Sequence, residues 1–173
     1  MIAAVGETLK LTPGESLTIR DSSPEALIVE ATYAAEGSPP PKHFHPSQSE
    51  RFEVVEGRLR ARVEGIDHEL EPGATLEVPS GVVHQMWNRR SWPARVIWRT
   101  SPAGRTEQWF RAVDALHRSG KVGRNGMPGM LAFAPLLAEY DDVIRLAGPQ
   151  PILRPAVRAL ALLGRARGYS PTP

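Results

Sequence analysis

The first hundred residues alternate between short segments typical of β-strands and turns rich in glycine, proline, asparagine and serine. Nine candidate strands follow one another: ETLKL, SLTIR, EALIVEATY, RFEVVEG, RLRARVEG, HELE, TLEVP, HQMWN and ARVIWRT. Short strands separated by such turns are typical of sandwiches and barrels. In RLRARVEG, Leu59, Ala61 and Val63 alternate with arginines, which indicates a strand with one buried face. We therefore expect an all-β body.

The pattern changes near residue 104, where helical spacing replaces alternation. Apolar residues recur every three or four positions in TEQWFRAVDALHR and again in LRPAVRALALLGRAR. The segment between them, MLAFAPLLAEYDDVIRLAG, also indicates a helix, with a kink or break at Pro135. Gly164 is expected to end the last helix. We predict a barrel domain over residues 1–104 and about three helices over residues 105–173, which pack on the barrel or at a dimer interface.

The 173-residue chain contains no cysteine, which excludes disulfides, thiolate metal sites, iron–sulfur clusters and cysteine nucleophiles. A metal site must then be built from imidazole and carboxylate groups, which suit iron, manganese, nickel, copper or zinc. The hydrophobic fraction of 41% and the charged fraction of 23% are ordinary for a domain that buries its own core.

The net charge of +2 is unevenly spread along the chain. Residues 1–104 hold 11 basic and 14 acidic side chains, whereas residues 105–173 hold 10 basic and 5 acidic ones. We interpret the basic segment as a solvated face or an intersubunit contact, because it contains no convincing helix-turn-helix for nucleic acid.

The first residues, MIAAVGETLKL, lack the basic start and the long apolar run of a signal peptide. No segment of the sequence approaches the roughly 20 apolar residues that cross a bilayer as a helix. We therefore expect a cytoplasmic protein without a membrane span.

Two of the five histidines stand close together in GSPPPKHFHPSQSERFEVVEG, residues 37–57. Residues two apart in an extended segment point to the same face, so His43 and His45 are able to bind one ion. The prolines before them disfavour a helix, and PSQS provides a turn through which Glu50 approaches. The alternative is that both histidines are bystanders on the wet face of a strand.

A second segment, GATLEVPSGVVHQMWN, adds His84 at the start of a predicted strand. The first segment has the pattern G-x5-H-x-H-x4-E-x6-G, and the second has the pattern G-x5-P-x-G-x2-H-x3-N. Both patterns, in this order, resemble the two conserved motifs of the cupin superfamily, and every motif position is present. The resemblance covers roughly residues 25–100 and says nothing specific about residues 105–173.

The resemblance implies a small jelly-roll barrel, or double-stranded β-helix, with a metal in its open mouth. Because cupins commonly dimerise through sheet edges, it also implies a homodimer. It implies that His43, His45, Glu50 and His84 bind one divalent transition metal per chain (iron, manganese, nickel, copper or zinc). Such a ligand set leaves coordination positions free for water, dioxygen or a chelating substrate. Glu50 is also a possible catalytic base.

Strand alternation predicts which other side chains face the metal. Phe52 shares a face with Glu50, Met86 shares one with His84, and apolar preference turns Trp98 inward. Gln48 lies near the motif histidines in sequence and is expected to hydrogen-bond a bound ligand. These four residues predict a largely apolar pocket for a small molecule with a metal-chelating pair of oxygens. The alternative is that the three apolar residues are simply core.

Among cupins with this ligand set, dioxygenases that resemble quercetinases are a leading class. We therefore expect a metal-dependent oxidoreductase, dioxygenase-like, that acts on a small chelating molecule. Two alternatives stay open: a metal-dependent isomerase or lyase, and a non-catalytic barrel that senses or stores a small molecule. One fold and one ligand set serve many reactions, so the sequence does not name the substrate.

Overall fold

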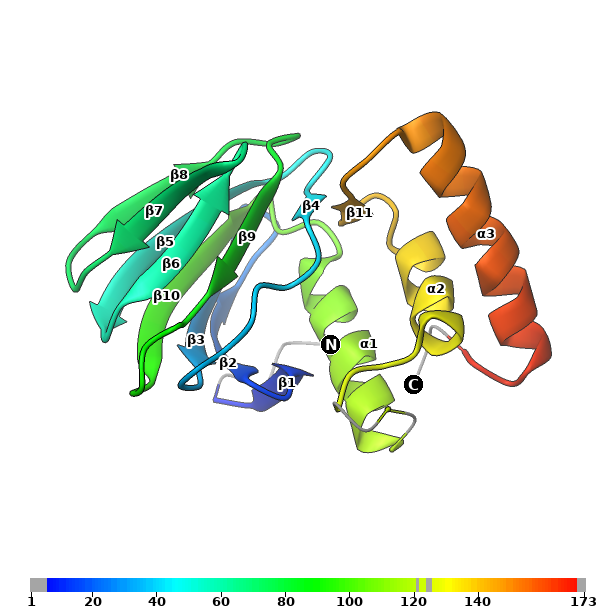
Figure 1. Cartoon of the computed structure of the whole chain (residues 1–173), viewed down its shortest axis with the longest axis horizontal. Helices are drawn as coiled ribbons and strands as arrows, with labels where there is room; N and C mark the ends of the chain where they lie inside the picture. Colours follow the sequence, from blue (N-terminus) through cyan, green and yellow to red (C-terminus); the bar gives the residue numbers. More distant parts are fainter. Residues whose placement is uncertain (1–5, 121, 124–125, 171–173) are drawn as a thin grey trace.

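The computed structural model describes residues 6–120, 122–123 and 126–170 of the chain. A two-sheet barrel comes first and three helices follow it, as alternation and helical spacing predict (Figure 1). The first five residues of the segment MIAAVGETLKL lie outside the described part.

Two antiparallel sheets form the barrel. The six-stranded sheet has the order β1-β2-β3-β10-β5-β8, with bounds Thr8–Thr12, Glu15–Ser22, Leu27–Tyr33, Ala94–Ser101, Ser49–Glu56 and Thr75–Val78. The five-stranded sheet has the order β11-β4-β9-β6-β7, with bounds Arg145–Leu146, His43–Phe44, His84–Trp87, Leu59–Val63 and Ile66–Leu70. Pairs such as β3 with β10 and β4 with β9 join strands far apart in sequence, which is the crossing pattern of a jelly roll. The predicted jelly-roll barrel is confirmed.

Alternation along the strands builds the core between the two sheets. Leu27, Val29 and Ala31 of β3 are buried, and the residues between them are half-buried. On β6, Leu59 and Ala61 are completely buried, while the alternating arginines point outward, as predicted. Full burial of one large aliphatic side chain contributes roughly 1.5–3 kcal/mol, so these rows supply much of the driving force for closing the barrel.

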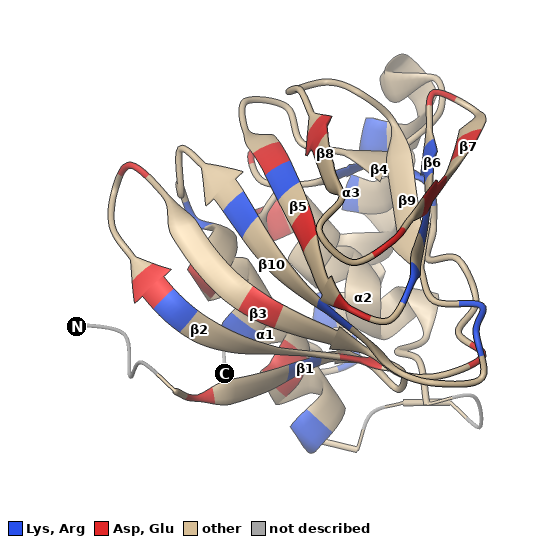
Figure 2. Cartoon of the chain, turned by 90° about the vertical axis from the view of Figure 1, so that its left-hand side faces the viewer, with Lys and Arg blue, Asp and Glu red and all other residues tan. Residues whose placement is uncertain are grey.

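The outer face of the six-stranded sheet is charged. Figure 2 shows acidic residues on β2, β3 and β5 and basic residues on β2, β5 and β10. Glu30 accepts from Arg20 at 2.7 Å and from Arg95 at 3.1 Å. Arg95 also donates to Glu56 at 2.8 Å. Exposed pairs of this kind contribute little individually, so their main effect is to keep this face in solvent.

Three helices follow the barrel: α1 (Thr106–Arg118), α2 (Met130–Glu139) and α3 (Gln150–Ala166). α1 packs against β1, α2 packs on α1, and α3 is outermost (Figure 1). Asp114 of α1 accepts a hydrogen bond from the Lys10 backbone N–H at 2.8 Å, which fixes the helix to the edge strand. In the described part of the chain, no helix is both long and apolar enough to cross a membrane.

The segment expected to form one long helix divides after Glu139. Pro135 lies inside α2 and does not end it. The chain then turns and forms β11, which pairs with β4 of the barrel. Strand pairing overrides the helix propensity of these residues, and sequence periodicity cannot anticipate such a long-range partner.

Gly164 does not end α3, which continues to Ala166. A Cβ atom at Gly164 would lie 2.2 Å from the Leu131 carbonyl oxygen of α2. The glycine therefore serves the close contact between α3 and α2 rather than the end of the helix.

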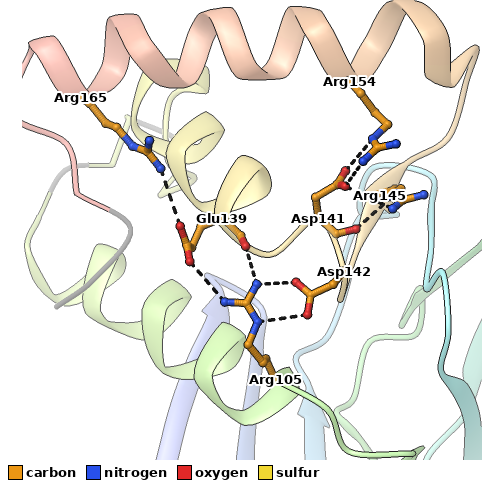
Figure 3. A network of polar contacts seen from close by, with 7 residues as sticks. All are labelled: Arg105, Glu139, Asp141, Asp142, Arg145, Arg154 and Arg165. Carbon is orange, nitrogen blue, oxygen red and sulfur yellow. Dashed lines mark hydrogen bonds and ion pairs between the residues drawn. The ribbon is translucent and has the colours of Figure 1, made fainter.

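A network of ion pairs ties the helices together (Figure 3). Arg105, just before α1, donates to both carboxylate oxygens of Asp142, with distances of 3.0 Å and 2.5 Å. Asp141 accepts from Arg154 of α3 at 2.5 Å and from Arg145 of β11 at 3.2 Å. The turn between α2 and β11 is thus held on both sides.

Candidate metal centre

Three histidines from two neighbouring strands converge at one end of the barrel. His43 of β4 and His84 of β9 are directly paired across the sheet, and His45 follows β4 by one residue. One candidate ligand nitrogen of each ring lies within 4.8 Å of the other two. His45 and His84 are buried, whereas His43 is half-buried. The fold therefore brings the two sequence segments to one point.

Each of the three rings is anchored through Nδ1 to a backbone carbonyl oxygen. The distances are 2.8 Å from His43 to Pro41, 2.7 Å from His45 to Val143 and 3.0 Å from His84 to Val82. A carbonyl oxygen only accepts, so Nδ1 must carry the proton, and Nε2 of the neutral ring is left as a lone pair. All three rings are therefore preset to offer Nε2 to a cation.

Glu50 contacts two of the rings. Its Oε1 lies 3.1 Å from His45 Nε2, and its Oε2 lies 2.9 Å from His84 Nε2. Trp98 donates a hydrogen bond from Nε1 to Glu50 Oε1 at 3.1 Å. Because Glu50 is only 2% exposed, this tryptophan and the two rings decide how its carboxylate is oriented.

Burial and mutual proximity shift the pKa values of this cluster. Burial raises the pKa of Glu50, but His45 and His84 outweigh that effect and lower it to about 2. Burial, together with the neighbouring His84 and His45, lowers the pKa of His43 to about 3. Burial also lowers the pKa of His84, but the carboxylate of Glu50 beside it raises that pKa above its usual value. A neutral His43 beside an ionised Glu50 attracts a cation.

The atoms of the cluster fit a divalent metal ion. Among the described residues, buried His45 Nε2 and Glu50 Oε2 have no hydrogen-bond partner. His45 Nε2 lies at ion-pair distance from Glu50, and Glu50 Oε2 lies at that distance from His84. Because Nδ1 carries the ring proton, Nε2 has no hydrogen to donate to the carboxylate in either contact. Unsatisfied buried acceptors are costly, and a metal bound by nitrogen and oxygen ligands would satisfy them together.

The histidines face a largely apolar cavity of about 220 Å³. Aromatic rings form one wall, with Trp98 stacked on Phe52 at a centroid distance of 5.3 Å and contacting Phe110 of α1 at 5.1 Å. The segment after the barrel lines the cavity with Trp109, Phe110, Val113, Met127, Pro128, Met130, Phe133, Leu137, Ile144 and Leu146. The barrel and the helical segment therefore form the cavity together.

Of the four residues predicted for the pocket, three line this cavity: Phe52, Met86 and Trp98. Gln48 does not line it. The Gln48 amide donates to the carbonyl oxygens of Pro102 and Ala103 at 3.0 Å and 2.7 Å, and to Thr106 Oγ1 at 2.6 Å. We therefore assign Gln48 a structural role, in which it fixes the start of α1, in place of the expected ligand contact. The expectation rested on nearness in sequence to the histidines, and nearness in sequence does not show where a side chain in the turn before β5 points.

Two titratable residues of the cavity were missed by the sequence reasoning, Glu15 and Tyr33. Strand alternation could have found Glu15, because it continues the inward row of Leu17 and Ile19 on β2. A second omission is Val143, whose carbonyl oxygen anchors His45 from outside the motif region. Nothing in the sequence pattern marks that contact.

Comparison with known proteins agrees with this geometry. Residues 29–99 match the family model described as "Cupin domain". An oxidoreductase of Arthrobotrys oligospora is 38% identical over 52 residues, which are 30% of this chain and 21% of that protein. The tetracenomycin polyketide synthase protein TcmJ of Streptomyces glaucescens is 37% identical over 94 residues, 54% of this chain and 48% of that protein. The chain thus spans less than half of the length of either relative.

Solved structures agree on the fold. KdgF from Halomonas sp. superposes with a TM-score of 0.54 at 22% identity, over 58% of this chain and 92% of that one. An RmlC-like cupin from Shewanella frigidimarina superposes with a TM-score of 0.53 at 21% identity, over 62% and 93% of the two chains. At this level of identity the likeness concerns the barrel alone.

Proposed function

Since the chain carries a cupin domain over residues 29–99, we propose that it is a metal-dependent oxidoreductase, dioxygenase-like in class, acting on a small apolar molecule that bears oxygen donors. His43, His45, His84 and Glu50 bind one divalent ion of iron, manganese, nickel, copper or zinc per chain. One observation carries the proposal: three rings, each anchored through Nδ1, place one candidate ligand nitrogen each within 4.8 Å of the other two, beside a buried carboxylate.

The bound metal would supply Lewis acidity and open coordination positions to the oxygen donors of a substrate. The protein's own groups hold that site in place. The carbonyl oxygens of Pro41, Val82 and Val143 fix the tautomer of the rings, and Trp98 holds Glu50. Glu50, whose carboxylate is ionised above a pKa of about 2, is also placed to accept a proton from a substrate hydroxyl at the site.

The walls of the cavity point to the substrate class. Aromatic and aliphatic side chains exclude water and favour a flat, largely apolar molecule. The names of the two relatives support this choice, because one is called an oxidoreductase and the other a polyketide synthase protein. We infer a polyketide-like aromatic substrate with vicinal oxygens at the metal end.

Elemental analysis of protein purified without chelator tests the metal. We expect close to one transition metal ion per chain, and a loss of at least about tenfold in metal affinity in His45→Ala and His84→Ala. His68→Ala is the matched control, because His68 lies on β7, outside the cluster, and this variant should keep the metal. Thermal melting shows whether each variant remains folded.

Oxygen uptake with aromatic ortho-diols as substrates tests the reaction class. Iron, manganese, nickel or copper together with oxygen consumption supports the oxidoreductase. Bound zinc without oxygen consumption would instead favour an isomerase or lyase. Bound diol without turnover would favour a sensing or storage role, and protein without any metal would refute the proposal.

A further inference from the structure

An acidic residue occupies the inward face of the six-stranded sheet. Glu15 opens β2 in the same row as Leu17 and Ile19, which are both completely buried. Alternation would place an apolar side chain there. A buried carboxyl group in such a row lowers stability, and departures of this kind are expected at functional sites.

Tyr33 is the partner of this carboxyl group. Glu15 and Tyr33 are directly opposite each other in the β2–β3 ladder, and their side chains are hydrogen-bonded. Both residues line the cavity that the three histidines face. Glu15 as a whole residue is half-buried, because it borders the cavity, but its carboxyl group is surrounded by protein.

We propose that Glu15 and Tyr33 form a second polar subsite of the cavity, which binds a hydroxyl or carbonyl oxygen of the ligand other than the oxygens held at the histidines. The ligand is therefore an aromatic molecule that carries oxygens at two separate places. This inference rests on the proposed function for the histidine end of the ligand, whereas the subsite itself depends only on the cavity.

The chemistry of the pair suits a neutral oxygen. Burial raises the pKa of Glu15 to about 7, although the Tyr33 hydrogen bond opposes this, and the Glu50 charge raises it further. The carboxyl group is therefore able both to donate and to accept near neutral pH. Burial likewise raises the pKa of Tyr33 above its usual value, so its hydroxyl keeps its proton.

The remaining charged groups of the cavity agree with this choice. Among the described residues that line it, the titratable ones are Glu15, Tyr33 and the three histidines, and none is lysine or arginine. An anionic phosphate or carboxylate on the ligand would have no cationic side chain to meet at the Glu15 end. A phenol or ketone oxygen needs only the hydrogen bonds that Glu15 and Tyr33 provide.

Quenching of tryptophan fluorescence tests the subsite in the full chain as purified, because Trp98 and Trp109 line the cavity. The probes are 2-naphthol, with one hydroxyl, and 1,5-, 2,6- and 2,7-dihydroxynaphthalene, with two. We expect at least one diol to bind about tenfold more tightly than 2-naphthol, the gain of a well-made buried hydrogen bond. In Glu15→Leu and in Tyr33→Phe that advantage should fall below about threefold, with 2-naphthol affinity unchanged.

Glu53→Gln is the matched control, since Glu53 is an exposed acid of the same sheet. Glu15→Met, which keeps the length of the side chain but has no hydrogen-bond donor, replaces Glu15→Leu if the latter does not fold. The subsite is refuted if no diol binds better than 2-naphthol, or if the advantage survives in both cavity variants. Bound metal is measured in the same samples. If wild-type protein held no metal but still bound a diol more tightly than 2-naphthol in a Glu15-dependent way, the proposed function would be refuted and the subsite supported.

Discussion

His45 Nδ1 lies 2.7 Å from the carbonyl oxygen of Val143, a residue 98 positions further along the chain. Val143 is buried in the turn between α2 and β11, and β11 itself pairs with β4, the strand just before His45. The segment after the barrel therefore belongs to the candidate metal centre. It supplies the acceptor for one histidine as well as part of the cavity wall.

This contact predicts that metal affinity depends on the helical segment. A single glycine inserted between Asp142 and Val143 should displace the acceptor and release the His45 ring. Loss of a carbonyl that orients a metal-binding histidine typically lowers affinity about 10–100-fold. Competition titration with a chromogenic zinc chelator measures the change.

The same glycine inserted between Gly148 and Pro149 is the control, because it lies beyond β11 and leaves Val143 in place. Circular dichroism confirms that both proteins fold. Equal affinities in the two insertion variants would show that Val143 does not support the site.

Gln48 leads to a prediction about stability. Its amide donates to the Ala103 carbonyl oxygen and to Thr106 Oγ1, both on buried residues, so Gln48→Leu removes two hydrogen bonds from the interior. We expect a loss of about 1–3 kcal/mol in the free energy of unfolding, with unchanged metal and naphthol affinity. Urea unfolding measures the first and the titrations above measure the second. If Gln48→Leu lost ligand affinity while its stability stayed unchanged, Gln48 would be a ligand-binding residue instead.

Glu15 predicts a pH dependence. Its pKa rises from 4.5 to about 7 on folding, so between these values the folded protein holds a proton that the unfolded chain has lost. Stability contributed by the protonated group is complete below pH 4.5 and disappears as the pH rises through 7. Relative to wild type, Glu15→Gln should therefore gain about 3 kcal/mol between pH 4.5 and pH 8.

Urea unfolding of both proteins at several pH values gives this difference in the free energy of unfolding. Glu50, His43 and His84 titrate in both proteins, so their contributions cancel in the difference. Glu53→Gln should show no such trend, because Glu53 is exposed on the outer face of the sheet. A flat difference for Glu15→Gln would mean that its carboxyl group is solvated in the folded state.

Local patterns were enough to predict the all-β body, and the resemblance to the cupin motifs predicted the jelly-roll barrel and the gathering of the histidines. Alternation is a property of each strand, and it placed Phe52, Met86 and Trp98 toward the interior where the cavity lies. The two motif segments carry His45 and His84 at positions that the β4–β9 pairing brings together.

Contacts between distant segments could not be predicted in the same way. The anchoring of His45 by Val143 depends on β11, whose residues have helical spacing in the sequence and become a strand only beside β4. Strand alternation could have predicted that Glu15 faces inward, but its proposed role depends on Tyr33 and on the helices that enclose the cavity. The ligand contact expected for Gln48 rested only on its nearness in sequence to the histidines, whereas its hydrogen bonds go to Ala103 and Thr106, more than 50 positions away.

The most direct test of the account is a crystal structure of metal-loaded protein with anomalous diffraction at the metal absorption edge. We predict one strong peak per chain, about 2.0–2.2 Å from Nε2 of His43, His45 and His84, with a Glu50 oxygen at a similar distance. Crystals of His84→Ala grown with the same metal should show no peak there. A peak bound through Nδ1, a peak elsewhere in the molecule, or none in the wild type would contradict the account.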